Sequence, residues 1–443
     1  MAILLVFGCV LAVCGNIWAS AFLAVGLIAL FMMVSNAKRA MLGEPLVFSD
    51  LALIGAIFKH PQFYLSALSQ SQKAMLVIAA PIVPGLMWWL FVLSLSAHLA
   101  GLAVFVAAAV LIKLSVAAQP MANLAHATDV EGDVARHGLL ATLILHRARW
   151  RETLDPAPCK LLPSSPHPRE LAIVIQCESF ADPVEVFGDP ALCLPGLASA
   201  RAEAWQWGDL LVSGFGAYTM RTEYGVLFGR SEAELGFRRF DPYLTALGEG
   251  TYALPSRLLP GGWRSLFVHP HDMRFYNREQ ILGAGGFDEL VGEHSFASPT
   301  PAEGRYVTDK AMAAEIIDLA GKAAVPTLIY AVTIENHGPW EAHATAGSLT
   351  DGYMRLVRNS DAMLVTLRAE LAKLKRPTTL VFFGDHRPSI PGVSMPGGAR
   401  HTPYVILRLD ADGHILWGEG QRIDLTPAEL HHTLLGLLSD PAA

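Results

Sequence analysis

Acidic and imidazole side chains stand directly after apolar, β-branched segments at four places in the sequence. Each of these segments has the composition of a buried strand, and the polar residues begin where it ends. They are Glu178, His269, His271, Asn336, His337, Asp385 and His386. Because ligands of parallel α/β sheets bind beyond the carboxyl ends of the strands, we expect these side chains to converge on one rim. Carboxylates and imidazoles gathered in this way can hold a divalent metal ion.

Two threonines, Thr219 and Thr222, supply hydroxyl groups in the glycine-rich segment 213–229. They lie at a turn before an expected helix. A helix N-terminus stabilises anionic groups through its unpaired N–H donors and its dipole. A hydroxyl activated there by a metal could attack a bound phosphate. The alternative is that Thr219 only caps the helix.

The elements that must position these residues alternate between strands and helices. Expected strands are 171–177, 265–270, 327–334, 378–384 and 404–409, and expected helices are 304–322, 353–375 and 426–438. Near-continuous apolar strands separated by helices are typical of a mostly parallel sheet that is covered on both faces. The sequence therefore predicts an α/β domain.

The charged residues are distributed unevenly along the chain. Only 16% of the 443 residues are charged, against roughly a quarter in an ordinary soluble protein. Residues 1–120 hold five basic and two acidic side chains, and the remainder holds 28 basic and 38 acidic ones. An apolar part is thus joined to a mildly acidic globular part. This composition excludes disorder and a fibrous repeat, and it predicts no binding of nucleic acid, because the soluble part lacks a positive field.

The first 120 residues are expected to form a transmembrane domain of about four helices, with three spans as the alternative. No charged residue occurs in 2–37 or in 74–112. Since a span takes ~20 apolar residues, each segment fits a helical hairpin. The first would comprise helices 2–14 and 17–35, and the second would turn within 94–98. The basic loop 36–73 between them would be cytoplasmic by the positive-inside rule.

Residues 121–168 are expected to connect this domain to the catalytic domain at 169–443. Residues 134–154 predict a helix, either on the membrane surface or packed in a core. Residues 155–168 contain five prolines and indicate a stiff linker. Cys159 and Cys193 are the only plausible disulfide among five cysteines, and whether they pair is left open.

Together, the motifs resemble the lipoteichoic-acid synthase and phosphoglycerol transferase branch of the sulfatase and alkaline phosphatase superfamily. The resemblance covers roughly 170–440 and also LGEPLVFSDL at 42–51. It implies an α/β/α sandwich behind the transmembrane helices. The sequence has no CxPSR segment, which disfavours sulfatases with a modified cysteine. Tyr276 stands where synthases of this type can carry Trp.

The resemblance also implies roles for individual residues. Thr219 would be the nucleophile, with Glu223 four residues on as in the family. His337, or His269, would transfer protons. The metal ligands would be Glu178, Thr219, Asp385 and His386, and the substrate-binding residues would be His269, Tyr276, Asn277 and Arg278. The implied metal is Mn²⁺, with Mg²⁺ or Zn²⁺ as alternatives.

The activity implied by the resemblance is transfer of a phosphoglycerol head group. Phosphatidylglycerol would be the donor, a phospho-threonine the intermediate, and a cell-envelope glycan or polymer the acceptor. Alternatives are a phosphoethanolamine transferase, a phosphodiesterase or sulfatase-like hydrolase, and a non-enzymatic membrane sensor. The family places its catalytic domain on the periplasmic or extracellular side of the bacterial inner (cytoplasmic) membrane. Positive-inside counting points to the opposite side.

Overall fold

The computed structural model describes residues 1–53, 70–117, 128–160, 167–300, 303–340, 348–418 and 420–439. It divides into two units, Met1–Leu154 and Asp155–Ala443. Three predicted features fall partly outside the described residues: the basic loop, at 54–69; the domain boundary, at 118–127; and the proline-rich linker, at 161–166. All five cysteines are free, including Cys159 and Cys193.

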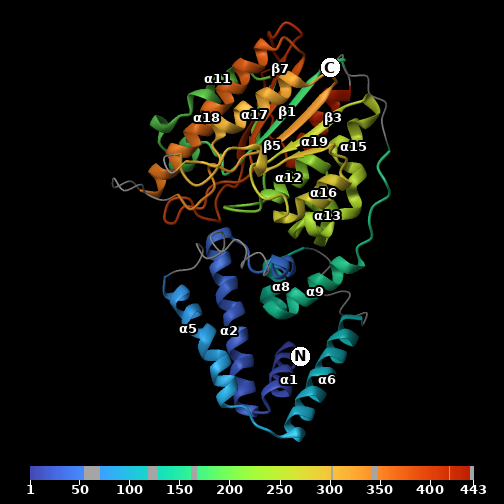
Figure 1. Ribbon diagram of the computed structural model, residues 1–443, viewed down its shortest axis with the longest axis vertical. Coiled ribbons are helices and arrows are strands. Elements are labelled where there is room, and N and C mark those ends of the chain that lie inside the picture. The colour runs from blue at the N-terminus through green and yellow to red at the C-terminus, as the bar shows by residue number, and fades with distance from the viewer. Residues whose placement is uncertain are drawn as a thin grey trace. The chain divides into compact units, whose positions relative to one another are not determined.

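The apolar half of the first unit consists of helices α1 (Ala2–Cys14), α2 (Ile17–Leu42), α5 (Gln70–Trp89) and α6 (Leu95–Ala117) (Figure 1). The break after α1 lies where the sequence predicts a turn, whereas the break after α5 falls at 90–94, before most of the predicted turn at 94–98, because α6 already begins at Leu95. Asn16 is the N-cap of α2, and its side chain accepts hydrogen bonds from the backbone N–H groups of Trp18 and Ala19. Among the described residues, only α2 and α6 are long and apolar enough to cross a membrane. The 13 residues of α1 extend ~20 Å, against ~30 Å of bilayer core, so a count of four spans stays a prediction.

Both hairpins turn at the same end of this helical group. The Asn16 side chain donates to the carbonyl of Leu90, and a His98 ring nitrogen lies 2.9 Å from the carbonyl of Ala12. Glycines allow α1 and α6 to approach closely, because a Cβ on Gly101 would overlap the backbone of Ala12. The chain therefore leaves α2 and α6 at the opposite end.

Two short helices, α8 (Val130–His137) and α9 (Leu139–Glu152), follow in the same unit. The sequence predicts one helix over 134–154, and this is wrong. Gly138 adopts a φ of 79° and ends α8, so the chain changes direction there. A buried pair, His146 Nε2 and Asp133 Oδ2 at 2.8 Å, joins the two helices.

The second unit contains one sheet in the order β2-β7-β6-β1-β5-β3-β4, with β8 beside β7. Its strands are β1 (Leu171–Cys177), β2 (Gln206–Leu210), β3 (Arg264–Val268), β4 (Glu289–Val291), β5 (Thr327–Val332), β6 (Thr378–Gly384), β7 (Thr402–Leu409) and β8 (Ile415–Leu416). The central strands β6, β1, β5, β3 and β4 are parallel, whereas β7 is antiparallel to β6. The mostly parallel α/β sheet predicted from the sequence is thus confirmed.

Helices cover both faces of the sheet (Figure 1). Alternate residues of β1, beginning with Leu171, pack in one core with α11 (Pro195–Glu203), α17 (Asp309–Lys322) and α18 (Leu349–Lys373). The other face carries α12 (Thr219–Phe228) and α19 (Pro427–Ser439). Shorter helices are α10 (Pro183–Phe187), α13 (Glu232–Leu235), α14 (Pro242–Thr245), α15 (Leu254–Leu258) and α16 (Arg278–Ala284). The 3₁₀ helices are η1 (Phe48–Leu53), η2 (Pro190–Leu192), η3 (Gly236–Phe240), η4 (Leu247–Tyr252), η5 (Leu259–Gly261), η6 (Phe275–Asn277) and η7 (Glu293–Ser295).

His431, in α19, makes the stability of this unit depend on pH. Its ring is fully buried, with Nδ1 3.0 Å from the carbonyl of Val226. Burial lowers the pKa of His431 from 6.5 to about 3. Between these values the unfolded chain binds more protons at this position, so folding stability falls as pH falls. We expect the melting temperature of the wild type, relative to that of His431→Gln, to decrease from pH 7 to pH 5. The control is His432→Gln, at the exposed neighbouring position. If the melting temperature of the wild type decreased as much relative to His432→Gln as relative to His431→Gln, the explanation would be contradicted.

Candidate active site

The site begins with two neighbouring strands that end level with each other. In the pairing of β1 with β6, Cys177 lies opposite Gly384. The next residues, Glu178 and Asp385, therefore leave the sheet side by side. A Cβ at Gly384 would overlap the carbonyl oxygen of Phe180, so only glycine permits this close approach. The register of the sheet, set by apolar strands, thus brings the two carboxylates together.

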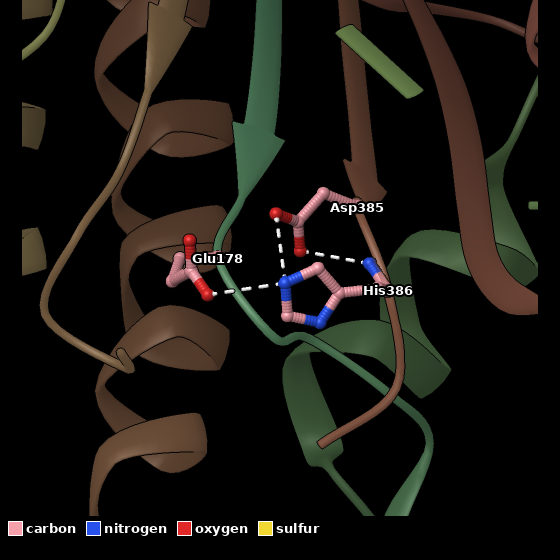
Figure 2. A group of neighbouring side chains, drawn as sticks. All are labelled: Glu178, Asp385 and His386. Atoms are coloured by element: carbon pink, nitrogen blue, oxygen red, sulfur yellow. Dashed lines mark hydrogen bonds and ion pairs between the residues drawn. The ribbon is translucent and has the colours of Figure 1, made fainter. Parts of the chain in front are cut away.

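Glu178, Asp385 and His386 form a buried cluster (Figure 2). The Nε2 atom of His386 lies 3.5 Å from Oε1 of Glu178 and 3.5 Å from Oδ2 of Asp385. The other ring nitrogen, Nδ1, is 3.1 Å from the carbonyl of Arg387. Donation to that carbonyl leaves Nε2 to face the carboxylates, which is the arrangement of a histidine that ligates a metal through Nε2.

Electrostatics at this cluster favour a bound cation. Burial and the charge of Glu178 raise the pKa of Asp385 to about 7. Burial alone would lower the pKa of His386, but the charges of Asp385 and Glu178 raise it overall. Two carboxylates held this close repel each other, and a positive charge between them removes the repulsion.

The donor atoms fit a divalent metal ion. One oxygen of Asp385, Oδ1, accepts hydrogen bonds from the backbone N–H groups of Ser179 and His386. The other oxygen, Oδ2, is buried and has no hydrogen-bond partner. Ligand atoms of Glu178, Asp385 and His386 all lie within 4.8 Å of one another. Two carboxylates and one imidazole suit Mn²⁺, Mg²⁺ or Zn²⁺.

The structure distinguishes the two threonines of the glycine-rich segment. Thr219 is the first residue of α12 and is buried, and its side chain is near enough to Asp385 to lower the pKa of that carboxyl against the larger effects that raise it. The Thr222 hydroxyl instead donates to the backbone carbonyl of Asp385 at 2.8 Å. Thr219 therefore lies at the carboxylate cluster and at a helix N-terminus, whereas Thr222 holds the loop after β6 in place.

His269 and His337 lie at the ends of β3 and β5. In His269, Nδ1 is 2.9 Å from the carbonyl of Val332, and burial holds the pKa of this residue well below its usual value. In His337, Nδ1 is 2.7 Å from the carbonyl of Gly338, and burial lowers the pKa to about 4. Both rings are therefore neutral at pH 7 and can accept a proton. His269 is buried and His337 is partly exposed.

Arg278, predicted to bind substrate, forms a buried ion pair with Glu223 of α12. Its Nε and Nη2 atoms donate to the two oxygens of Glu223 at 3.1 and 2.8 Å. The Tyr243 hydroxyl donates to the same carboxylate at 2.7 Å. Tyr276 and Asn277 precede Arg278 in left-handed conformations, with φ of 58° and 60°. The ion pair fixes Arg278 to the helix of Thr219, and a role in substrate binding stays a prediction.

Breaking this ion pair should destabilise the fold strongly. In Glu223→Gln the guanidinium of Arg278 stays buried without its counter-charge, at a cost of about 3–5 kcal/mol. The control is Glu289→Gln, which breaks the exposed pair between Arg264 and Glu289 and should cost about 0–1 kcal/mol. Melting temperatures of the two variants provide the comparison. A melting temperature of Glu223→Gln as high as that of Glu289→Gln would contradict the importance of the pair.

Ser179 and Thr333 complete the cluster, and neither was among the predicted residues. Ser179 has a φ of 51°, and its hydroxyl donates to Oε1 of Glu178 at 2.8 Å. The Thr333 hydroxyl accepts from the backbone N–H of Glu178 at 3.0 Å. Asn336 instead donates to the carbonyl of Ser179 and accepts from Trp340. Both residues could have been found from the sequence, because Ser179 directly follows Glu178 and Thr333 directly follows the residues of β5.

Two other groups of acidic and imidazole residues occur among the described residues. In the group of Glu185, Asp209 and His401, arginines already balance the charge, because Arg387 bonds Glu185 and Arg422 bonds Asp209. The second group, Asp410, Asp412 and His414, lies in a turn after β7 and is partly or fully exposed. The cluster of Glu178, Asp385 and His386 is the one in which all three members are buried.

Comparison with known proteins finds two curated relatives, both from Rhizobium meliloti (strain 1021). The chain is 30% identical over 430 residues to the capsular polysaccharide biosynthesis protein RkpI, covering 88% of this chain and 78% of that protein. It is 28% identical over 255 residues to a putative cyclic β-1,2-glucan modification protein, covering 54% of this chain and 39% of the relative.

The second unit also matches a family model and a solved structure. The model of the family named Sulfatase matches residues 170–438. The solved structure is the Streptococcus pyogenes phosphoglycerol transferase GacH in complex with sn-glycerol-1-phosphate. It is 16% identical, with a TM-score of 0.49, and the match covers 63% of this chain and 76% of that one. The family match spans β1 to α19 and therefore includes every strand that carries the cluster.

Proposed function

The chain belongs to the sulfatase family, and we propose that it is a membrane-anchored, metal-dependent phosphoglycerol transferase of the cell envelope. The observation that carries the proposal is the place of Thr219, which is buried at the start of α12 and near enough to Asp385 to affect the pKa of that carboxyl. A hydroxyl beside a cluster that held a metal, and at a helix N-terminus, could attack a phosphorus atom and remain esterified. Thr219 would itself be the fourth metal ligand, beside Glu178, Asp385 and His386.

A divalent cation held there, for which we propose Mn²⁺, would lower the pKa of the Thr219 hydroxyl and balance charge on a phosphate oxygen. The remaining steps belong to residues of the chain. The Thr219 oxygen forms a bond to the phosphorus of phosphatidylglycerol, the bond from phosphorus to the diacylglycerol oxygen breaks, and the proton lost by Thr219 ends on that oxygen. A hydroxyl group of the acceptor then attacks the phosphoglyceryl-threonine, the Thr219 oxygen leaves, and the proton lost by the acceptor restores the Thr219 hydroxyl.

We assign the proton transfers to His337. Its pKa of about 4 keeps the ring neutral at pH 7, so it can accept a proton from the acceptor hydroxyl. His269 is the alternative, but it is more deeply buried than His337. Arg278 would bind the phosphate or the glycerol through donors that Glu223 does not use, next to Tyr276 and Asn277.

The head group and the acceptor rest on different observations. Phosphoglycerol is proposed from the sequence motifs around Thr219 and Arg278. An envelope polysaccharide as acceptor is supported by the relatives, which by name concern capsular polysaccharide biosynthesis and glucan modification. Phosphoethanolamine transfer and hydrolysis would use the same cluster, so the assay must distinguish them.

The decisive experiment follows head-group release from labelled lipid. Purified full-length protein is incubated with phosphatidylglycerol or phosphatidylethanolamine, with Mn²⁺, Mg²⁺ or Zn²⁺, and with or without a capsular polysaccharide or cyclic glucan. We expect diacylglycerol from phosphatidylglycerol and labelled glycan, both dependent on metal. If diacylglycerol were released from phosphatidylethanolamine alone, the transferred head group would be phosphoethanolamine and not phosphoglycerol. Release of free glycerol phosphate without labelled glycan would identify a hydrolase.

We further propose that the anchor is multi-pass in the inner membrane and that the catalytic unit lies on the periplasmic side. Both hairpins turn at the same end of the helical group. If all four helices cross, the loop after α2 and the chain after α6 emerge on one side. If that side is the periplasm, as we propose, an alkaline phosphatase fused after Pro120 should be active, because this reporter works only outside the cytoplasm. An inactive fusion would reverse the orientation.

A further inference from the structure

The unit Met1–Leu154 contains a cavity that the catalytic site does not use. Its volume is ≈ 660 Å³, within the range of sites that hold small organic ligands. Residues near the start of α1, the second half of α2 and the end of α6 form part of the wall, and α8 and α9 form the rest. The cavity therefore lies where the chain leaves the two helices that are long enough to span the membrane.

The lining of this cavity is mostly hydrocarbon. From α2 it includes Ile28, Phe31 and Met32, and from α9 it includes Leu140 and Ile144. None of these side chains is buried by the protein, and Met32 is 55% exposed. An apolar surface of this kind is stable only when another apolar group covers it.

The opposite side of α9 is already occupied. Thr142, Leu143 and His146 are buried within the same unit and do not line the cavity, and His146 bonds Asp133. Trp150 stacks on Phe48 at 5.5 Å. The helix thus packs through one side and presents apolar residues to the cavity through another. These contacts hold α9 in position, and no protein side chain has to fill the cavity for that.

Polar residues from three helices also line the cavity. They are Ser35, Asn36 and Arg39 from α2, Ser115 from α6, and His137 from α8. Arg39 pairs with Glu131 at 2.6 Å, but both side chains are about half exposed, so water screens this pair and a second anion can compete for the guanidinium. A ligand with an apolar body and an anionic head matches this combination.

We propose that the cavity binds a diacyl glycerophospholipid, with an acyl chain along the apolar wall and the phosphate beside Arg39 and His137. The inference rests on the proposed function only in identifying the bound lipid with the donor, because a transferase must hold the lipid whose head group it takes. Lipid binding itself depends on the contacts of the first unit.

Photo-crosslinking tests the proposal in the full-length protein. The chain is reconstituted in phosphatidylcholine nanodiscs that contain a small fraction of phosphatidylglycerol carrying a diazirine in one acyl chain, and labelled peptides are mapped by mass spectrometry. Metal is omitted, so no transfer takes place. We expect labels to concentrate on the cavity walls of α2 and α9. Labels spread evenly over the exposed surfaces of all apolar helices would reflect surrounding bilayer lipid only and would overturn the proposal.

Cavity-filling variants sharpen the test. Ile144→Trp and Leu140→Trp should each reduce labelling of α2 severalfold. Leu111→Trp lies on α6, is exposed and does not line the cavity, so it should leave the label unchanged. Equal labelling in all three variants would overturn the proposal. Melting temperatures show whether each variant folds, and the wild-type map decides the question if one does not.

Head-group recognition is tested with Arg39→Gln. The phosphatidylglycerol probe should label the cavity walls severalfold less in this variant than in Arg136→Gln, which removes an exposed arginine outside the cavity lining. Equal labelling of the two variants would remove Arg39 and the phosphate from the proposal. A labelled cavity in a protein that transfers no phosphoglycerol would refute the function alone. Transfer with an unlabelled cavity would refute this inference alone.

Discussion

Thr219→Ala should reduce the transfer of phosphoglycerol by at least about 10³-fold, because a nucleophile that forms a covalent intermediate has no substitute in the site. The loss should appear in diacylglycerol release from phosphatidylglycerol under saturating metal. The fold should be retained, since Thr219 is one buried residue at a helix start and no hydrogen bond to the backbone depends on its side chain among the described contacts. A variant that retains full transfer would refute the assignment.

Two matched variants separate the nucleophile from its surroundings. Thr222→Val removes the hydrogen bond to the carbonyl of Asp385 and should cost about 1 kcal/mol of stability while leaving most of the turnover. Thr219→Ser keeps a hydroxyl and should keep part of the activity. If Thr222→Val abolished transfer and Thr219→Ala did not, the two threonines would have exchanged roles.

The covalent intermediate offers a second measurement on the wild type. Without acceptor, the phosphoglyceryl group should remain on Thr219 and add about 154 Da to the intact mass, the mass of glycerol phosphate less one water. The addition should map to the first residue of α12 and should be absent from Thr219→Ala. An adduct on another residue would redirect the mechanism to that side chain.

The sequence predicted the parts of the site that long apolar strands position. β1 and β6 are continuous runs of buried residues, so the apolar composition alone locates their ends, and with them Glu178 and Asp385. β2 and β4 were not predicted, because QWGDL contains polar residues and glycine and β4 has only three residues. Their pairing depends on neighbours that are distant in sequence.

The contacts that hold the side chains were less accessible to sequence reasoning. Glu223 and Arg278 are 55 positions apart, and nothing in their spacing shows that they form a buried pair. The left-handed conformation of Ser179 arises from the turn that the chain makes between β1 and the cluster. The break between α8 and α9 had a local signal in Gly138, which the apolar pattern on both sides outweighed. Strand ends follow from composition, whereas the hydrogen bonds around them follow from packing.

Asp385→Asn should change stability in opposite directions with and without metal. In chelated protein, the raised pKa of Asp385, about 7, means that its charged form opposes folding at pH 8. Asparagine removes that charge and keeps an oxygen for the N–H groups of Ser179 and His386. We therefore expect the chelated variant to melt no lower than the chelated wild type, and up to a few degrees higher.

Metal should reverse this order. At a concentration of Mn²⁺ hundredfold above its dissociation constant, the wild type should gain about 2.7 kcal/mol, whereas the variant, which lacks one anionic ligand, should gain little. Asp182→Asn is the control, because Asp182 caps α10 and pairs with Arg201, and this variant should melt lower in both conditions. An Asp385→Asn protein that is less stable than wild type after chelation would show that Asp385 supports the fold by itself. If Mn²⁺, Mg²⁺ and Zn²⁺ all left the melting temperature of the wild type unchanged, the metal site would be refuted. The difference in melting temperature between Asp385→Asn and the wild type should therefore have opposite signs with and without metal. This reversal is expected of a carboxylate that binds a cation, and it is not expected of one that stabilises the protein by itself.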